Sequence, residues 1–384
     1  MLIGSATEVR VGDMFSGGGG VGAGVAGLDG VRVIWAANHW RVAAQHHARR
    51  YPDVEIVCQD LCQFDFRLMP RVDILWASPS CTGHSEAAQP ARARDAELGD
   101  AHDHLRATAW AVVSAVMAKR PRAFIVENVR EFQEWTWPDV TLETCGSLHV
   151  AKARALWWVK QEAARVRGGD ATIVIVKRGK KREPKLYEVV RRSRKGILYQ
   201  QWLDLFRSAG YYLTEHICTA TRWGDPQRRA RFILVGHIAG EINLVEPGGP
   251  EATVRPILDF DAGEWIPISK INANGQRSAA QARVEHAHDL FGGAPCWGQH
   301  VSHRGAWGRS LDQACTTITT QNQHWLTRDG EYRLFSKSET GQIMSFDRDY
   351  FDDVPDTNSK IMAGNAVCVL KARGIVKQVA ESIG

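Results

Sequence analysis

The chain has 384 residues and a formal net charge of +5, from 48 Lys and Arg against 43 Asp and Glu. Hydrophobic residues make up 44% and charged residues 24%, which is typical of a folded globular protein and not of a disordered one. The apolar runs fall far short of the roughly 20 residues that span a bilayer. The first ten residues contain no apolar signal-peptide core. We therefore expect one large domain or two ordinary ones, in the cytoplasm.

The positive charge is concentrated in a single segment. Residues 151–195 hold 15 Lys and Arg and 4 Asp and Glu, a net charge of +11. The rest of the chain holds 33 basic and 39 acidic residues, a net charge of −6. The whole positive balance therefore comes from this one stretch.

The cysteines and histidines do not predict a metal site. The eight cysteines are irregularly spaced and form no CxxC pair, so neither a structural zinc site nor a disulfide framework is expected. His102-Asp103-His104 lacks a third ligand and is expected in a loop. His46 and His47 are expected on the exposed face of a helix.

Strand-like and helix-like segments alternate through the first third of the chain. Helices are predicted from the glycine-rich turn through residue 25, at 41–50 and at 108–118. Strands are predicted at residues 9–14, 31–36, 55–57, 72–77 and 123–126. This β-α-β alternation predicts an α/β fold with a parallel, doubly wound sheet.

Residues 132–196 interrupt this alternation. Two strand-like runs, at 171–177 and 185–190, flank the basic sequence RGKKREP and predict a basic hairpin arm.

Regular patterning then returns. A helix is predicted at 201–209 and a strand at 231–235. Residues 241–308 are rich in Gly and Pro and are expected to be irregular, with little helix. A last helix is predicted at 366–380.

A glycine-rich loop, Phe15-Ser-Gly-Gly-Gly-Gly, follows the first predicted strand and opens a helix. Such a loop lets a ligand approach the backbone in front of a helix N-terminus. Gly17, Gly19 and Gly22 satisfy the pattern GxGxxG, but an NAD site would also need an acid after the second strand. The chain has Asn38-His39-Trp40 there, which disfavours NAD. Other nucleotide-like cofactors, or a tight turn without a ligand, remain as interpretations.

Reactive and charged residues follow the later strands. Cys81 stands in SPSCTGHS after the fourth predicted strand, where the ligand crevices of α/β proteins form, and is either a nucleophile or a structural thiol. Glu127 ends the fifth strand in the sequence ENV and could face the same crevice. QRRAR, ending at Arg231, puts two guanidinium groups on one face, which suits phosphate or base contacts. The sequence GNAV, at 364–367 near the C-terminus, is the last of these motifs.

In this order the motifs resemble those of the DNA cytosine-5 methyltransferases, over almost the whole chain. DMFSGGGG is similar to the cofactor loop of that family and SPSCTGHS to its nucleophile loop, while ENV, QRRAR and GNAV are similar to later motifs. SLDQACTTITT and RLFSKSETGQIMSF resemble the segments that close its recognition domain. The resemblance implies a Rossmann-like, S-adenosylmethionine-dependent methyltransferase core.

The resemblance also implies a domain organisation. The catalytic domain would span residues 1–240, with the basic insert at about 132–196. A small, irregular target-recognition domain would span 241–330. Residues 331–384 would return to the catalytic domain.

A covalent mechanism is implied as well. The thiolate of Cys81 would add to C6 of a cytosine that is flipped out of the duplex. Glu127 would hold the N3 edge of the base and donate a proton there. Arg231, supported by Arg229, would orient the base.

The resemblance further implies the residues that hold S-adenosylmethionine. Phe15 and Trp40 would sandwich the adenine, and Asp60 would accept from its amine. His39 stands where the family usually has the acid that binds the ribose hydroxyls, so altered cofactor binding is expected. The other implied contacts are Ser16, Gly17, Gly19, Asn365 and Pro79. Two further departures from the family pattern, Ser80 and Thr82, flank Cys81.

The basic insert is predicted to grip DNA. Residues 241–308 hold 8 acids and only 5 Lys and Arg, whereas the insert can neutralise phosphates and release their counterions. The alternative is a solvated surface hairpin. The predicted DNA contacts are Ser85, Gln227, Lys177, Arg178, Lys180, Lys181 and Arg182.

The function predicted from the sequence is therefore DNA cytosine-5 methylation, as in restriction–modification. The alternatives are an RNA cytosine-5 methyltransferase, transfer of a non-methyl group from a modified cofactor, and a catalytically silent DNA-binding homologue. The size of 241–308 favours duplex DNA, and intact Cys81, Glu127 and Arg231 favour activity. We expect a monomer that acts on double-stranded DNA, with no membrane partner.

Overall fold

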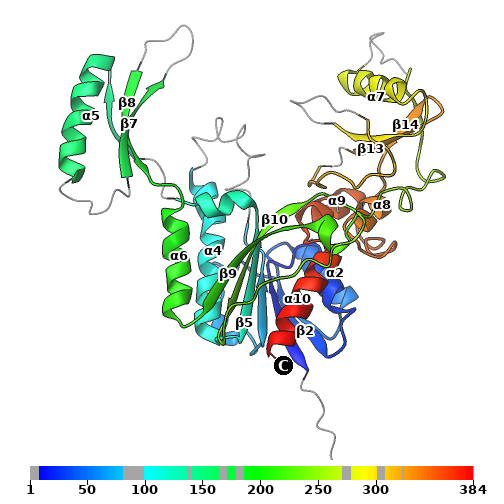
Figure 1. Ribbon diagram of the computed structural model, residues 1–384, viewed down its shortest axis with the longest axis horizontal. Helices are drawn as coiled ribbons and strands as arrows, with labels where there is room; N and C mark the ends of the chain where they lie inside the picture. Colours follow the sequence, from blue (N-terminus) through cyan, green and yellow to red (C-terminus); the bar gives the residue numbers. More distant parts are fainter. Residues whose placement is uncertain are drawn as a thin grey trace, which may run out of the picture. The chain divides into compact units, whose positions relative to one another are not determined.

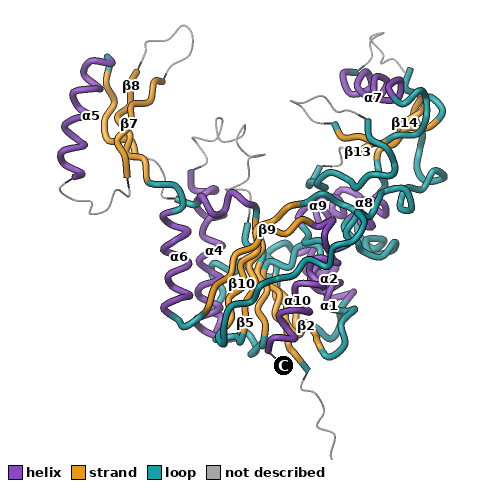
Figure 2. The backbone as a smooth tube through the Cα atoms, in the orientation of Figure 1, coloured by secondary structure: helices purple, strands orange, loops and turns teal. Residues whose placement is uncertain are grey.

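A computed structural model describes residues 8–80, 99–136, 140–163, 171–178, 186–269, 278–300, 308–321 and 324–383. The chain divides into two compact units. The first comprises Met1–Ser80, Arg106–Asn128 and Tyr211–Gly384, and the second comprises Cys81–Leu105 and Val129–Gly210. Figures 1 and 2 show the helices and strands of each.

A seven-stranded sheet, in the order β3-β2-β1-β4-β5-β10-β9, forms the centre of the first unit. The first five strands in this order run parallel, and β10 is antiparallel to both of its neighbours. The residues of β4 and β5 are all buried, which is why they read as continuous apolar runs. The strands are β1 (Val9–Met14), β2 (Val31–Ala37), β3 (Glu55–Val57), β4 (Ile74–Ala77), β5 (Ala123–Asn128), β9 (Tyr212–Thr219) and β10 (Ala230–His237). The predicted Rossmann-like fold is confirmed.

Helices from the two ends of the chain pack on one face of this sheet. The first helix, α1 (Gly20–Val25), and the last, α10 (Val369–Ile383), share an apolar cluster with β1, β4, β5 and β10. Residues of α10 such as Ile375, Val376 and Val379 are fully buried there. The other long helices of the core are α2 (Arg41–Arg50) and α4 (Gly99–Lys119). Within the described ranges, no helix is long and apolar enough to cross a membrane.

A four-stranded antiparallel sheet, in the order β11-β14-β13-β12, lies in the C-terminal half of the same unit. Its strands are β11 (Ile266–Pro267), β12 (Trp297–Gln299), β13 (His324–Arg328) and β14 (Glu331–Leu334). The helix α7 (Ala279–Leu290) buries Val284 and Ala287 against Trp325. The expectation of little helix in 241–308 was wrong here. A capping box between Ser278 and Gln281 begins α7, and this pair is a local sequence signal for the start of a helix.

Two helices, α8 (Lys337–Ile343) and α9 (Asp356–Asn365), follow this sheet. They share an apolar cluster with the loops of 254–318 and with Trp40. The predicted helix at 366–380 begins only at Val369, because α9 ends at Asn365 and the chain turns in between. Short 3-10 turns complete the unit, η1 (Phe66–Leu68) and η5 (Ala220–Trp223).

The second unit contains the basic insert. Its three antiparallel strands, in the order β6-β8-β7, are β6 (Val140–Cys145), β7 (Ala171–Arg178) and β8 (Leu186–Ser193). The pairing of β7 with β8 confirms the predicted hairpin. An unpredicted helix, α5 (Leu148–Ala163), packs Ala151 and Trp158 against this sheet.

A second cluster in this unit is aromatic. The helix α6 (Ile197–Ser208) begins four residues earlier than predicted. Its Trp202 packs edge-on against Phe132 of η4 (Arg130–Glu134), with ring centroids 5.3 Å apart, and against Phe206 at 4.8 Å.

Two expectations about histidines were wrong. His46 and His47 are buried, at 0% and 2% exposure, because the face of α2 that carries them packs against the segment 344–354. Nδ1 of His46 lies 2.9 Å from Oδ1 of Asp353. The backbone of 102–104 belongs to α4 and is not a loop.

Candidate active site

The carboxyl ends of the five parallel strands form one row. The register aligns Val57, Ala37, Met14, Ala77 and Val126 as successive partners across β3, β2, β1, β4 and β5. The residues that follow these positions therefore lie at a single edge of the sheet, where ligands of open α/β sheets bind. This edge receives Phe15, His39 and Trp40, Asp60, Pro79 and Glu127.

The glycine loop lies directly against the C-terminal GNAV segment. A Cβ atom at Gly17 would lie 3.6 Å from the carbonyl oxygen of Asn365, and one at Gly20 would lie 2.0 Å from that of Val367. At Gly19, where φ is +89°, a Cβ would lie 2.2 Å from the hydroxyl oxygen of Tyr350. Close packing within the protein thus explains Gly19 and Gly20. The sequence pattern predicted either the approach of a ligand or a tight turn without one.

The predicted cofactor residues have the exposure that such a role needs. Phe15, Trp40 and Asp60 are half-buried, and His39 is exposed. Ser16 is buried, and its N–H donates to the carbonyl oxygen of Ala37 at 3.0 Å, which joins the ends of β1 and β2. The rings, the carboxylate and the adjacent backbone fit an adenosine-containing group.

Pro79 is held in place by a residue at the end of the neighbouring strand, β5. It is buried, and its carbonyl oxygen accepts from Nδ2 of Asn128 at 3.1 Å. This hydrogen bond ties the start of the SPSC loop to ENV. Cys81 and Ser85 lie outside the described residues.

Glu127 lies between two cations. Its Oε1 atom is 3.6 Å from Nε of Arg231 and 3.5 Å from Nζ of Lys371. The side chains of Glu127, Arg231 and Lys371 are 9%, 14% and 0% exposed. The predicted pair of Glu127 and Arg231 is thus close in space, and a third charged group that was not predicted joins it.

Arg229 and Gln227 lie in the interior behind this site. Arg229 donates from Nη1 to the carbonyl oxygen of Ile318 at 3.1 Å and from Nη2 to that of Gly364 at 3.2 Å. Gln227 is fully buried, and Oε1 of its amide accepts from the N–H of Ile318 at 2.8 Å. The predicted contact of Gln227 with DNA therefore needs correction, because its side chain holds the protein interior together.

Asp225 is a second charged residue that was not among the predicted site residues. It is buried, and its carboxylate accepts from the backbone N–H groups of Leu370 and Lys371 at 3.1 and 2.9 Å, which caps the N-terminal end of α10. Burial raises the pKa of Asp225 to about 6, against the opposing effect of its hydrogen bonds and of Lys371. A sequence signal existed for Lys371, since it stands four residues before Ile375 on the apolar stripe of α10.

The remaining predicted DNA contacts belong to the basic hairpin. Lys177 is exposed near the end of β7, and Arg178 is the last residue of that strand. Lys180, Lys181 and Arg182 lie outside the described residues. No group of three His, Cys, Asp or Glu side chains that could hold a metal occurs in the described part of the chain.

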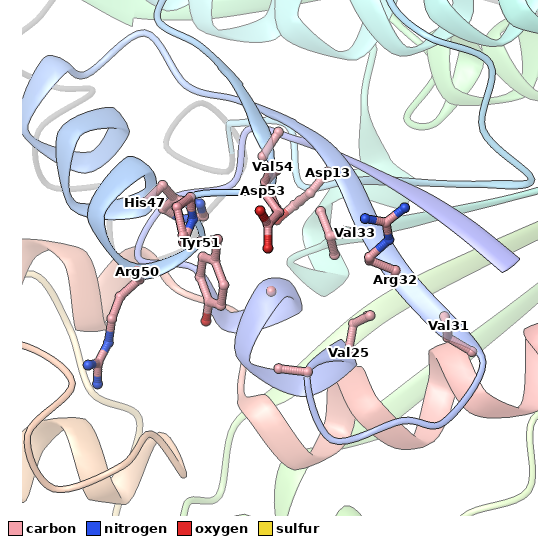
Figure 3. Close-up of a pocket in the computed structure, with 14 residues that line it drawn as sticks. Asp13, Val25, Val31, Arg32, Val33, His47, Arg50, Tyr51, Asp53 and Val54 are labelled. Atoms are coloured by element: carbon pink, nitrogen blue, oxygen red, sulfur yellow. The ribbon is translucent and has the colours of Figure 1, made fainter. Parts of the chain in front are cut away.

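A cavity of about 220 Å³ is lined by residues of α1, α2 and β2, and none of the predicted cofactor residues lines it (Figure 3). Asp13, His47 and Tyr51 are among the residues that line it. Oδ2 of Asp13 and Nε2 of His47 are buried, and neither has a hydrogen-bond partner among the described residues. Burial raises the pKa of Asp13 well above its ordinary value.

The buried imidazole of His47 makes stability depend on pH. Burial, followed by the charge of His46, lowers the pKa of His47 to about 4. Its contribution to stability is therefore present above its unfolded pKa of about 6.5 and lost as the pH falls through 4. Between pH 7 and 4, we expect the unfolding free energy to fall by up to about 3 kcal/mol more in the parent than in His47→Gln.

Urea denaturation at a series of pH values measures this difference. His149→Gln, at an exposed position, is the control and should follow the parent. Parallel pH profiles for the parent and His47→Gln would contradict the expectation.

Comparisons with known proteins identify the family of the chain. The sequence model of the family described as C-5 cytosine-specific DNA methylase matches residues 9–140 and 188–381. The unmatched residues between these ranges fall in the basic insert. The Type II methyltransferase M.NlaX of Neisseria lactamica is 22% identical over 379 residues, covering 97% of this chain and 96% of that protein. The Type II methylase M.HgiDII of Herpetosiphon aurantiacus is 26% identical over 220 residues, covering 50% of this chain and 61% of that protein.

Solved structures show the same fold at low identity. The methyltransferase EhMeth of Entamoeba histolytica has a TM-score of 0.58 at 12% identity, covering 99% of this chain and 100% of that one. The Dnmt2 methyltransferase of S. pombe has a TM-score of 0.55 at 13% identity, covering 98% and 99%. Since the family match runs from β1 to α10, the chain belongs to the C-5 cytosine-specific DNA methylases and is an enzyme of that class.

Proposed function

We propose that this enzyme methylates C5 of a cytosine that is flipped out of double-stranded DNA, through a covalent adduct of Cys81. The observation that carries the proposal is the place of Glu127. It stands at the carboxyl end of β5, 3.6 Å from Arg231, and its neighbour Asn128 is bonded to the start of the SPSC loop. A carboxyl group and a guanidinium together suit the polar edge of a pyrimidine.

In the proposed reaction, the thiolate of Cys81 forms a bond to C6 of the cytosine, and the electron pair of the C5–C6 double bond moves to C5. Glu127 donates a hydrogen bond and a proton to N3, which offsets the charge that develops there. Arg231 orients the base, and Arg229 supports it from the interior. After methyl transfer to C5, a base removes the C5 proton, the electron pair of that C–H bond restores the C5–C6 double bond, and the thiolate of Cys81 leaves C6. N3 returns its proton to Glu127.

S-adenosylmethionine, when bound, supplies an electrophilic methyl group. We propose that Phe15 and Trp40 hold its adenine and that Asp60 accepts from its amine. Ser16, Gly17, Gly19 and Asn365 would lie along its amino-acid portion, and Pro79 near the sulfonium. His39 would contact the ribose with one hydrogen bond, where a carboxylate would make two. No metal is required in this scheme.

Covalent trapping tests the proposal directly. DNA that contains 5-fluorocytosine retains fluorine at C5, so the adduct cannot eliminate the thiolate. We expect the full-length enzyme with S-adenosylmethionine to form a covalent complex that survives denaturing electrophoresis. Cys81→Ser should form none, and Cys58→Ser, at an exposed thiol, should trap like the parent. Trapping by Cys81→Ser would overturn the nucleophile assignment.

The same preparation separates the alternatives. Methyl transfer to tRNA but not to duplex DNA would indicate an RNA methyltransferase. Mass spectrometry of nucleosides from modified DNA would reveal a transferred group other than methyl. A protein that binds DNA but neither traps nor modifies it would be the silent homologue.

We propose that residues 241–330 recognise the target sequence and that 1–240 and 331–384 form the catalytic domain. The protein would act as a monomer, in the cytoplasm, where the DNA of a bacterium or an infecting phage lies. The basic insert would supply the grip on phosphates, and its exposed Lys177 supports this role. Ser85, Arg178, Lys180, Lys181 and Arg182 would also contact DNA.

Neutralising the hairpin should weaken the dependence of DNA binding on salt. In a variant with Lys177, Lys180, Lys181 and Arg182 all replaced by Gln, we expect the slope of log Kd against log salt to fall by up to about 0.9 for each phosphate that the hairpin no longer neutralises. These substitutions leave the strands β7 and β8 in place, whereas deleting the hairpin would remove them. Lys377→Gln, at an exposed position of α10, is the control. An unchanged slope in the quadruple variant would exclude the insert from phosphate binding.

A further inference from the structure

Lys371 is a buried lysine without an evident structural purpose. Its side chain is 0% exposed, and no described residue accepts a hydrogen bond from its Nζ. It stands on the face of α10 whose other members, among them Ala372, Ile375 and Val376, fill the apolar core. Burying an ammonium group is costly, and an alkyl side chain would pack there without that cost.

The only carboxylate within ion-pair distance of this ammonium, among the described residues, is Glu127. Nζ of Lys371 lies 3.5 Å from Oε1 of Glu127, and that oxygen has no hydrogen-bond partner in the described structure. Nε of Arg231 lies 3.6 Å from the same oxygen. Both cations thus approach Oε1, which leaves Oε2 for another partner.

We propose that Lys371 is a positioning residue for Glu127: its ammonium holds Oε1, so that Oε2 is presented to the cytosine. This inference rests on the proposed role of Glu127 in base binding. The separation of 3.5 Å is at the edge of a hydrogen bond, and such contacts in free enzymes tighten when the substrate binds. Arg231 is partly exposed and is needed for the base, so the fully buried Lys371 provides the fixed side of the carboxylate.

Other ionisable groups surround Lys371 without replacing Glu127. Asp225 accepts from the backbone N–H of Lys371, and its carboxylate also caps α10. Burial raises the pKa of Cys218 to about 11 and that of Cys368 to about 12, and the charge of Lys371 opposes both shifts. Neither thiol is an ion-pair partner of this side chain, and among the described residues Glu127 fills that role.

Kinetics of Lys371→Met, Lys371→Arg, Glu127→Gln and the double variant Lys371→Met/Glu127→Gln test this role. We expect Lys371→Met to lower kcat by about 10-fold or more with an unchanged KM for S-adenosylmethionine, and Lys371→Arg to recover part of the loss. In the Glu127→Gln background, Lys371→Met should change kcat by less than about twofold, because its effect passes through the carboxyl group. The control is Lys377→Met, at an exposed lysine on the same helix.

Thermal melting establishes that each variant is folded at the assay temperature, and Lys371→Gln replaces Lys371→Met if the latter is not. A kcat for Lys371→Met equal to that of the parent would overturn the inference. So would an equal, additional loss in the Glu127→Gln background, since Lys371 would then act independently. Full activity of Glu127→Gln alone would overturn the role of Glu127 itself, whereas loss in that variant with normal Lys371→Met would overturn only the present inference.

Discussion

Glu127→Gln should lower kcat by about 100-fold or more while leaving the dissociation constant of S-adenosylmethionine unchanged. The amide keeps the size of the side chain and can still hydrogen-bond to the base, but it cannot deliver a proton to N3. The loss should appear in the rate of covalent bond formation to Cys81, because N3 protonation assists that step. Single-turnover methylation and the rate of 5-fluorocytosine trapping measure it.

This experiment needs a control for stability, because Glu127 has two charged neighbours. Removing the carboxylate takes away the ion-pair partner that Lys371 and Arg231 share, and breaking a buried ion pair costs about 3–5 kcal/mol of unfolding free energy. Melting curves must therefore show that Glu127→Gln is folded during the assay. Glu241→Gln, at an exposed carboxylate, should retain the parent rate. A folded Glu127→Gln enzyme that traps as fast as the parent would remove Glu127 from the chemistry.

Six of the seven strands of the central sheet were predictable because they are short apolar runs bounded by turn residues, whereas β9 was not predicted. The expected bounds of β1, α2 and β3 agree with the structure. Helices α5 and α7 were not predicted, each for a different reason. The charged residues of α5 obscure the apolar pattern of the face that packs on its small sheet, and α7 lies in a segment rich in Gly and Pro.

The residues of the site were predictable only where they belong to a sequence motif. Glu127 and Arg231 belong to motifs, and the structure places them together. Asp225 and Lys371 belong to none of these motifs, and their importance depends on burial. The apolar stripe of α10 indicates the burial of Lys371, whereas Asp225 lies outside any helix or strand. His46 and His47 were misjudged because their burial depends on a segment about 300 residues further along the chain.

Arg333→Met, outside the active site, should lower the free energy of unfolding by about 3–5 kcal/mol. Arg333 and Glu339 are 3% and 1% exposed and form a two-pronged ion pair, with Nη2 2.6 Å from Oε1 and Nη1 2.7 Å from Oε2. Glu339 also accepts from the backbone N–H groups of Asp259 and Ser336, which joins the loop before β11 to the start of α8. Without Arg333, this buried carboxylate would lose its only cationic partner among the described residues.

The chain contains a control at the surface, where another arginine forms a two-pronged pair with a carboxylate. Arg255 and Asp312 also form a two-pronged pair, at 2.5 and 2.7 Å, but they are 57% and 61% exposed. Because water and salt screen exposed pairs, Arg255→Met should cost less than about 1 kcal/mol. Urea unfolding of both variants, at low and high salt, compares them directly. If the two substitutions cost the same, burial would not be the origin of the effect, and the connection between β14 and α8 would depend on backbone capping instead.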